Sequence, residues 1–449
     1  MTPQHLPPPA RRLAIVAVLG LAAIRAGAQQ PRPLAPLSQF LQRAAAQNFD
    51  NREAQAVLVQ RQRESDAAWA RLLPSVTLQT DAIKNQYLGT AEIPTGTPSA
   101  NGILTTRRVV ITPLDQRDAS AVASVPLIDL NAMRAAQAAH ATRDAQEARV
   151  RMTRLDVQKT VAHTWYQLAG ALGVARAARQ TLAAAVDNVC VLATRVEAGL
   201  ASDLDVKRAQ AEVERDKQAV ADADYTVGNL SRSLTAVTGA DVMVDTSTTP
   251  PTLAPDDLHA EAPLTEWGVG LSAVPSVEAA ARDRHANELS ASAARGTLLP
   301  SISAQLTQRS TNAVGFGRSP YYVLELLGTW KLDLSAASTA RAQQSAATAA
   351  AVRADRALVD ATNAVTDAWE QVQSQIANVR ATRSSLEASR AALSVARDRY
   401  TSGRATTLDV VQAERDAFSA EVTSLQAEAD LAWARANLRL TSGRALEGR

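Results

Sequence analysis

The chain has 449 residues, 46% of them apolar but only 4% aromatic, so its hydrophobicity comes from Ala, Val and Leu rather than from the large side chains that fill globular cores. Its 47 basic and 45 acidic residues nearly cancel, which argues against a nucleic-acid partner. With only 19 glycines and 19 prolines the chain is neither collagen-like nor a low-complexity linker, and its composition suits long helices packed side by side.

The N-terminal segment, residues 1–28, has the three parts of a secretory signal peptide. Arg11-Arg12 precedes an apolar run at 13–24, and Ala26-Gly27-Ala28 forms a small-x-small cleavage site. The run is too short for a transmembrane anchor, which needs about 20 apolar residues. No later apolar stretch reaches that length, so a segment that crosses a membrane would have to do so as strands.

The remaining chain contains an internal repeat. Leu72–Val76 (LLPSV) matches Leu298–Ile302 (LLPSI) at an offset of 226 residues. Gly199–Val206 matches Gly403–Val410 at an offset of 204, through a glycine followed by Leu-Asp-Val. Because the two offsets differ, the first unit is expected to contain an enlarged loop, which we place at 89–116.

We predict a first repeat at 29–240, a linker at 241–263 and a second repeat at 264–449. Each repeat is expected to contain a helix, a strand pair, a long helix, a turn and a returning helix. The first helices are predicted at 36–71 and 260–297, the strand pairs at 73–130 and 299–334, and the turns near Gly199 and Gly403.

The sequence after each Leu-Leu-Pro-Ser element alternates between apolar and polar residues, which indicates amphipathic strands. In the first unit one face holds Val76, Leu78, Thr80 and Ala82, and the other holds Thr77, Gln79 and Asp81. Segments of about ten residues with this pattern match tilted strands that span a bilayer. The pattern also fits a half-buried hairpin on a soluble domain, and at this point both alternatives stay open.

A very long helix is predicted after each strand pair, at 131–197 and 335–400. In the second, Val365, Trp369, Val372, Ile376 and Val379 are spaced 4, 3, 4 and 3, as in a heptad seam. The first unit repeats this spacing with Val161, Trp165, Leu168, Leu172 and Ala175. At 1.5 Å per residue each helix would be roughly 100 Å long. The sequence therefore predicts two antiparallel coiled-coil hairpins.

The sequence contains no recognisable catalytic or metal-binding motif. Its one cysteine, Cys190, lies in a helical pattern and is expected to be buried and inert. The five histidines fall at no metal-binding spacing, and there is no dinucleotide-binding, phosphate-binding or nucleophile-elbow motif. We therefore predict no catalytic residue, no metal and no cofactor, and do not expect an enzyme.

The duplicated order of elements, with Leu-Pro-Ser at the strand start and Gly-x5-Asp-Val at each turn, resembles the TolC-type outer membrane efflux protein family. The resemblance covers essentially the whole chain after the signal peptide. It implies a mainly α fold with minor β, in which four strands per chain of a homotrimer close a twelve-stranded barrel in the outer membrane. The helices would form a hollow cylinder across the periplasm.

The function implied by this resemblance is a passive exit duct for small molecules or polypeptides, within a tripartite efflux pump or a type I secretion system. Its partners would be outer membrane lipid, a periplasmic adaptor protein and, indirectly, an inner-membrane pump. The alternative is a soluble periplasmic structural or adaptor protein that uses its coiled-coil hairpins for binding.

The resemblance also assigns roles to the two turns. The residues expected to face the adaptor are Gly199, Leu200, Ala201, Ser202, Gly403, Arg404, Ala405 and Thr406. Asp409 resembles a carboxylate that lines the channel constriction, and Tyr400 and Asp205 resemble a bonded pair that keeps it closed. Gln412 stands where some members have a second constriction carboxylate. Alternatively, Asp205 and Asp409 simply complement the dipoles of the helices that they begin.

Overall fold

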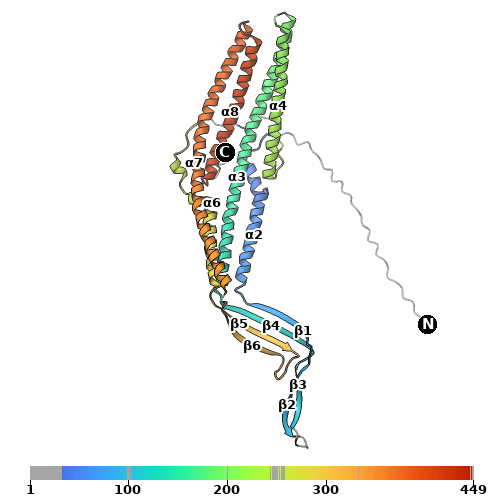
Figure 1. The fold of residues 1–449 in the computed structure, drawn as a ribbon. Coiled ribbons are helices and arrows are strands. Elements are labelled where there is room, and N and C mark those ends of the chain that lie inside the picture. The colour runs from blue at the N-terminus through green and yellow to red at the C-terminus, as the bar shows by residue number, and fades with distance from the viewer. Residues whose placement is uncertain are drawn as a thin grey trace, which may run out of the picture.

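The computed structural model describes residues 33–98, 102, 104–199, 201–242, 244, 251, 253, 258–331, 333–444 and 446, and forms a long bundle of helices with a small sheet at one end (Figure 1). The predicted signal peptide lies outside the described residues, as does part of the predicted linker at 241–263. The boundaries of the two repeats stay a prediction.

The elements follow the duplicated order expected from the sequence. The first unit contains α1 (Leu37–Gln47), α2 (Phe49–Ala70), β1 (Ser75–Lys84), β2 (Gly89–Pro98), β3 (Leu104–Thr112), β4 (Asp115–Ile128), α3 (Leu130–Glu197) and α4 (Asp203–Thr238). The second contains α5 (Leu264–Trp267), the 3-10 helix η1 (Leu271–Ala273), α6 (Pro275–Gly296), β5 (Ser301–Thr311), β6 (Tyr321–Thr329), α7 (Leu334–Thr401) and α8 (Thr407–Thr441). With 68 residues each, α3 and α7 are roughly 100 Å long, as predicted.

The predicted first helices are each interrupted, which corrects the sequence analysis. The helix expected at 36–71 breaks at Asn48, whose extended backbone separates α1 from α2. The Asn48 side chain accepts a hydrogen bond from the Asn51 N–H (3.1 Å) and donates one to the Val237 carbonyl near the end of α4 (2.9 Å). Asn48 therefore begins α2 and joins it end to end with α4. The helix expected at 260–297 is divided into α5, η1 and α6, with a proline at the start of α6.

The sheet has the antiparallel order β1-β4-β5-β6. Its register aligns Val76, Ala123, Leu306 and Leu324 in one row across the four strands, so one face is apolar as the alternation predicted. The enlarged loop is more ordered than expected, because it contains the separate hairpin β2–β3. This hairpin continues beyond the distal end of the sheet (Figure 1).

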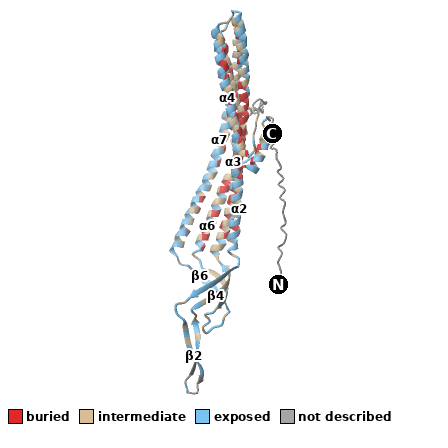
Figure 2. Cartoon of the chain, turned by 90° about the vertical axis from the view of Figure 1, so that its right-hand side faces the viewer, coloured by how far each residue is buried: buried red, intermediate tan, exposed pale blue. Residues whose placement is uncertain are grey.

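The buried core lies where the long helices pack together, whereas the sheet is mostly exposed or intermediate (Figure 2). Trp165 of α3 and Trp369 of α7 occupy equivalent places in its two halves. The indole N–H of Trp165 donates to the Ala35 carbonyl and that of Trp369 to the Ala262 carbonyl, both at 2.9 Å. Each tryptophan thus holds the segment just before the first helix of its half, α1 or α5, against the long helix.

Cys190 is exposed on α3, so the prediction of a buried thiol was wrong. It lies near the C-terminal end of α3, which ends at Glu197. Among the described helices, none combines the length and hydropathy that a membrane-spanning helix requires.

Candidate functional site

Both predicted turns lie at the end of the molecule farthest from the sheet (Figure 1). Gly199 (φ +73°) and Gly403 (φ +75°) each have a left-handed backbone that strains residues with a Cβ. The N–H of Gly199 donates to the Val196 carbonyl (2.9 Å) and that of Gly403 to the Tyr400 carbonyl (3.0 Å). The two turns therefore end their long helices in the same way. Leu200 lies outside the described residues.

The helices that leave the turns begin with equivalent capping boxes, Ser202 with Asp205 and Thr406 with Asp409. The Ser202 hydroxyl donates to Oδ2 of Asp205 (2.7 Å), and the Asp205 N–H donates back to that hydroxyl (3.3 Å). The Thr406 hydroxyl and N–H both donate to Oδ2 of Asp409 (2.8 Å each). These bonds lower the pKa of both carboxyl groups, mainly through the Ser202 hydroxyl at Asp205 and the Thr406 N–H at Asp409. Both aspartates thus lie in the first turn of their helices and complement the helix dipole, whereas a role at the constriction stays a prediction.

The remaining predicted site residues lie close to these caps. The guanidinium of Arg195 in α3 stacks over the ring of Tyr400 in α7, 4.9 Å from its centroid, and links the two turns. Among the described residues Asp205 bonds to Ser202 rather than to Tyr400, and the closing contact between Tyr400 and Asp205 stays a prediction. Gln412 is exposed and donates to Oδ1 of Asp416 (3.0 Å).

An ionic contact between the two hairpins was not predicted. Arg415 of α8 makes a bidentate pair with Glu212 of α4, with Nε to Oε1 at 2.9 Å and Nη2 to Oε2 at 2.5 Å. Glu212 is only 7% exposed and also accepts a bond from Arg215 (2.7 Å). Arginine and glutamate are common on helix surfaces, so no pattern in the sequence marks this pair. This ion pair connects α4 to α8 a few helical turns after Gly199 and Gly403.

A second buried carboxylate adjoins this pair. Asp216 of α4 is 8% exposed, and its Oδ2 is buried with no hydrogen-bond partner among the described residues. Burial raises the pKa of Asp216 to about 6, with further contributions from the negative charges of Glu212 and Glu414. Glu414 is itself held by Arg397 of α7 (2.9 Å). This cluster of three carboxylates therefore contains one group that titrates near neutral pH.

The sequence model of outer membrane efflux proteins matches residues 40–240 and 271–444. The chain belongs to this family. No curated protein sequence matches the chain. As an outer membrane efflux protein it is located in the outer membrane, with an extended helical part in the periplasm, and its family consists of channel proteins rather than enzymes. This location argues against the alternative of a soluble periplasmic adaptor.

Solved outer membrane channels share the fold. CmeC of Campylobacter jejuni is 15% identical, with a TM-score of 0.74 over 98% of this chain and 94% of that one. VceC of Vibrio cholerae is 17% identical, with a TM-score of 0.72 over 92% and 97%. The open state of MtrE from Neisseria gonorrhoeae is 20% identical, with a TM-score of 0.69 over 91% and 89%. At these identities the similarity establishes the architecture of the efflux protein, with both its helical hairpins and its sheet.

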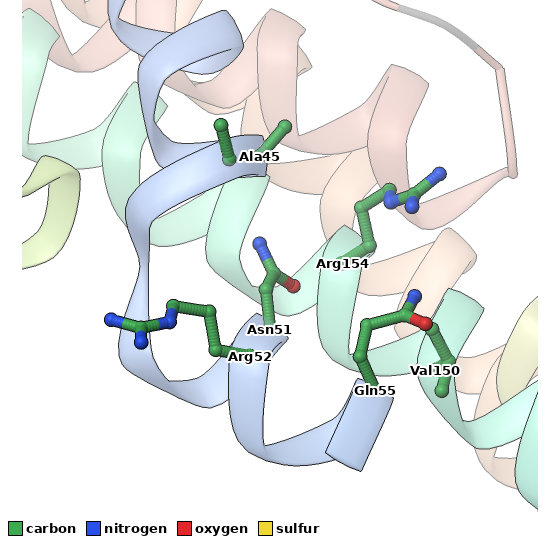
Figure 3. A pocket seen from close by; sticks show the side chains of 7 residues that line it. Ala45, Asn51, Arg52, Gln55, Val150 and Arg154 are labelled. Carbon is green, nitrogen blue, oxygen red and sulfur yellow. The ribbon is translucent and has the colours of Figure 1, made fainter. Parts of the chain in front are cut away.

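Away from the turns, a pocket of about 260 Å³ lies where the break between α1 and α2 meets α3 (Figure 3). Its lining residues are Ala45, Ala46, Asn51, Arg52, Gln55, Val150 and Arg154. Arg52, Gln55 and Arg154 are exposed, so it is a surface depression. Among the described residues of the efflux protein, no group of three or more His, Cys, Asp or Glu is arranged to hold a metal ion.

The caps lead to a testable expectation for the turns. Replacing Thr406 by alanine removes the hydroxyl that bonds Asp409, and is expected to lower the free energy of unfolding by about 1 kcal/mol. The pKa of Asp409 is lowered in the folded state. Its charged carboxylate therefore contributes to the stability of the folded protein above the ordinary pKa of aspartate, and this contribution is lost as the pH falls. Denaturant unfolding at pH 7 and at pH 3 checks this. The difference in free energy of unfolding between the unmodified protein and Thr406→Ala should be smaller at pH 3. An equal difference at both pH values would contradict the claim that the charged form of Asp409 strengthens the cap.

Proposed function

We propose that the protein is a passive exit duct, assembled as a homotrimer, for a tripartite efflux pump or a type I secretion system. The observation that carries this proposal is the four-stranded sheet with two open edges at the end of long helical hairpins. Every residue of the edge strands β1 and β6 is exposed in the single chain. Open edges are not tolerated in lipid, where each unpaired backbone group costs several kcal/mol.

Pairing β6 of one chain with β1 of the next would remove these edges. Three copies of a four-stranded sheet then close a twelve-stranded barrel, and the helices continue it as a hollow cylinder. The apolar row through Val76 and Leu324 would face the lipid, and the opposite, polar face would line the lumen. Transport through such a tube needs no covalent chemistry, so its energy would come from an inner-membrane pump.

The periplasmic end of the duct would carry both recognition and closure. The turns around Gly199 and Gly403 are proposed to meet a periplasmic adaptor, because they are the most distant points of the helical hairpins from the membrane (Figure 1). In the closed state Asp205, Tyr400, Asp409 and Gln412 would surround the constriction. Both capped carboxylates are charged at neutral pH, so three copies of each would favour cations there.

Single-channel recording in planar bilayers, together with the mass in detergent, tests this proposal. We expect a stable trimer with small currents in the closed state. Replacement of Tyr400 by phenylalanine removes the hydroxyl of the predicted lock and should increase the conductance, and Asp409→Ala should lower cation selectivity. A monomer that never inserts would refute the duct. Trimers whose currents do not respond to either substitution would retain the duct but reject these residues as its gate.

A further inference from the structure

The polar face of the sheet carries a marked imbalance of charge. In the register of β1, β4, β5 and β6, the charged residues on this face are Asp81, Asp118, Arg309 and Glu325. The opposite, apolar face carries Lys84, Asp115 and Arg117, all toward the distal end of the strands. The polar face therefore holds three carboxylates and one guanidinium in each chain.

The one guanidinium on this face is already engaged. Nη2 of Arg309 lies 3.1 Å from Oδ2 of Asp118, whose side chain is only 8% exposed. Gln116 also donates to this oxygen (2.8 Å). The other oxygen, Oδ1 of Asp118, is buried, and the Thr311 side chain directly opposite on β5 also bonds this carboxylate. Asp118 and Arg309 thus neutralise each other, and the remaining hydrogen-bonding capacity of Asp118 is met by neutral side chains.

Asp81 stands directly opposite Asp118 in the pairing of β1 with β4. Like charges in directly opposite positions repel each other and destabilise a sheet. The contact that Asp81 makes is with the neutral amide of Gln79, at 3.1 Å, which does not offset the charge. Because Asp118 is paired with Arg309, Asp81 is the carboxylate of this row that has no cationic partner, and a mobile cation beside Asp81 would supply the missing positive charge.

Glu325 adds a second acidic level nearer the helices. It is paired with Gln305 of β5, whose other neighbour is Ser124 of β4, so its cross-strand neighbours are uncharged. Glu325 and Asp81 are both exposed. Two levels of carboxylate therefore lie along the polar face, one near each end of the sheet.

We propose that Asp81 and Glu325 make the barrel section of the duct cation-selective, independently of the periplasmic turns. This inference rests on the proposed function, since it needs the polar face to line a lumen. Three chains would place six uncompensated carboxylates along that lumen. Charges of one sign lining a passage with low-dielectric walls concentrate their counter-ions and repel ions of their own sign. Small cations and cationic cargo would accordingly pass more readily than anions.

The test is the ratio of K⁺ to Cl⁻ permeability, obtained from the reversal potential of single channels in a KCl gradient. Asp81→Asn and Glu325→Gln are each expected to lower this ratio roughly two- to fivefold, and the double variant to lower it further. Asp115→Asn is the matched control, because it removes the same charge from the opposite face of the sheet. Its ratio should equal that of the unmodified protein.

The outcomes separate this inference from the proposed function. Channels of ordinary conductance whose permeability ratio is unchanged in the double variant would overturn the inference and leave the duct intact. An equal loss of selectivity in Asp115→Asn would also overturn it, since the polar face would then have no special role. Absence of any current in the unmodified protein would refute the duct itself.

Discussion

Replacement of Trp165 by alanine is expected to lower the free energy of unfolding by about 3–5 kcal/mol per chain, the usual cost of truncating a large buried aromatic side chain. Trp165 is 8% exposed and lies in the core formed by α1, α3 and α4. Its truncation leaves a cavity and also removes the hydrogen bond to the Ala35 carbonyl. Denaturant unfolding of the protein in detergent, followed by circular dichroism, measures the loss.

Two further variants separate the contributions of packing and hydrogen bonding. Trp165→Phe retains most of the buried area but not the N–H, so about 1–2 kcal/mol is expected. Trp369→Ala should resemble Trp165→Ala, because Trp369 holds the Ala262 carbonyl in the equivalent way. If Trp165→Ala cost no more than Trp165→Phe, the packing role assigned to the Trp165 ring would be wrong.

The long helices were predictable because their signal is periodic and duplicated. The heptad seams are buried as their spacing requires, apart from the partly buried Trp369, since a coiled coil repeats the same local contact many times. The alternation in β1 and β6 likewise fixes which face is apolar. The heptad spacing and the strand alternation each depend on many residues together, so they can be recognised even when single positions depart from the pattern.

Features that depend on one residue or one distant pair were not predictable. The helix break at Asn48 arises because its amide also bonds the Val237 carbonyl of α4, 189 positions away in the sequence. The hairpin β2–β3 lies in a stretch rich in Thr, Gly and Pro, where the alternation of apolar and polar residues is weak. Of the candidate site, the turn glycines and caps follow from local sequence. The contact between Arg415 and Glu212 needs the packing of α8 against α4.

The second large expected effect concerns Asp216 at the junction of the two hairpins. Burial raises its pKa from 3.8 to about 6, so folding disfavours its charged form. The contribution of this group to stability is therefore fully present below about pH 4 and is lost as the pH rises through about 6. At 1.36 kcal/mol per pKa unit the loss is at most about 3 kcal/mol at pH 7.

Asp216→Asn keeps the shape of the side chain without its charge. We expect this variant to be about 1–3 kcal/mol more stable than the unmodified protein at pH 7, and equal to it near pH 4. Unfolding experiments between pH 4 and pH 7.5 measure the difference, and the exposed Asp222 of the same helix, replaced in the same way, is the control. Should Asp216→Asn be less stable at pH 7, the carboxylate would have to gain a cationic partner in the assembled protein. The raised pKa of Asp216, assigned to burial and to the charges of Glu212 and Glu414, would then be wrong for the assembled protein.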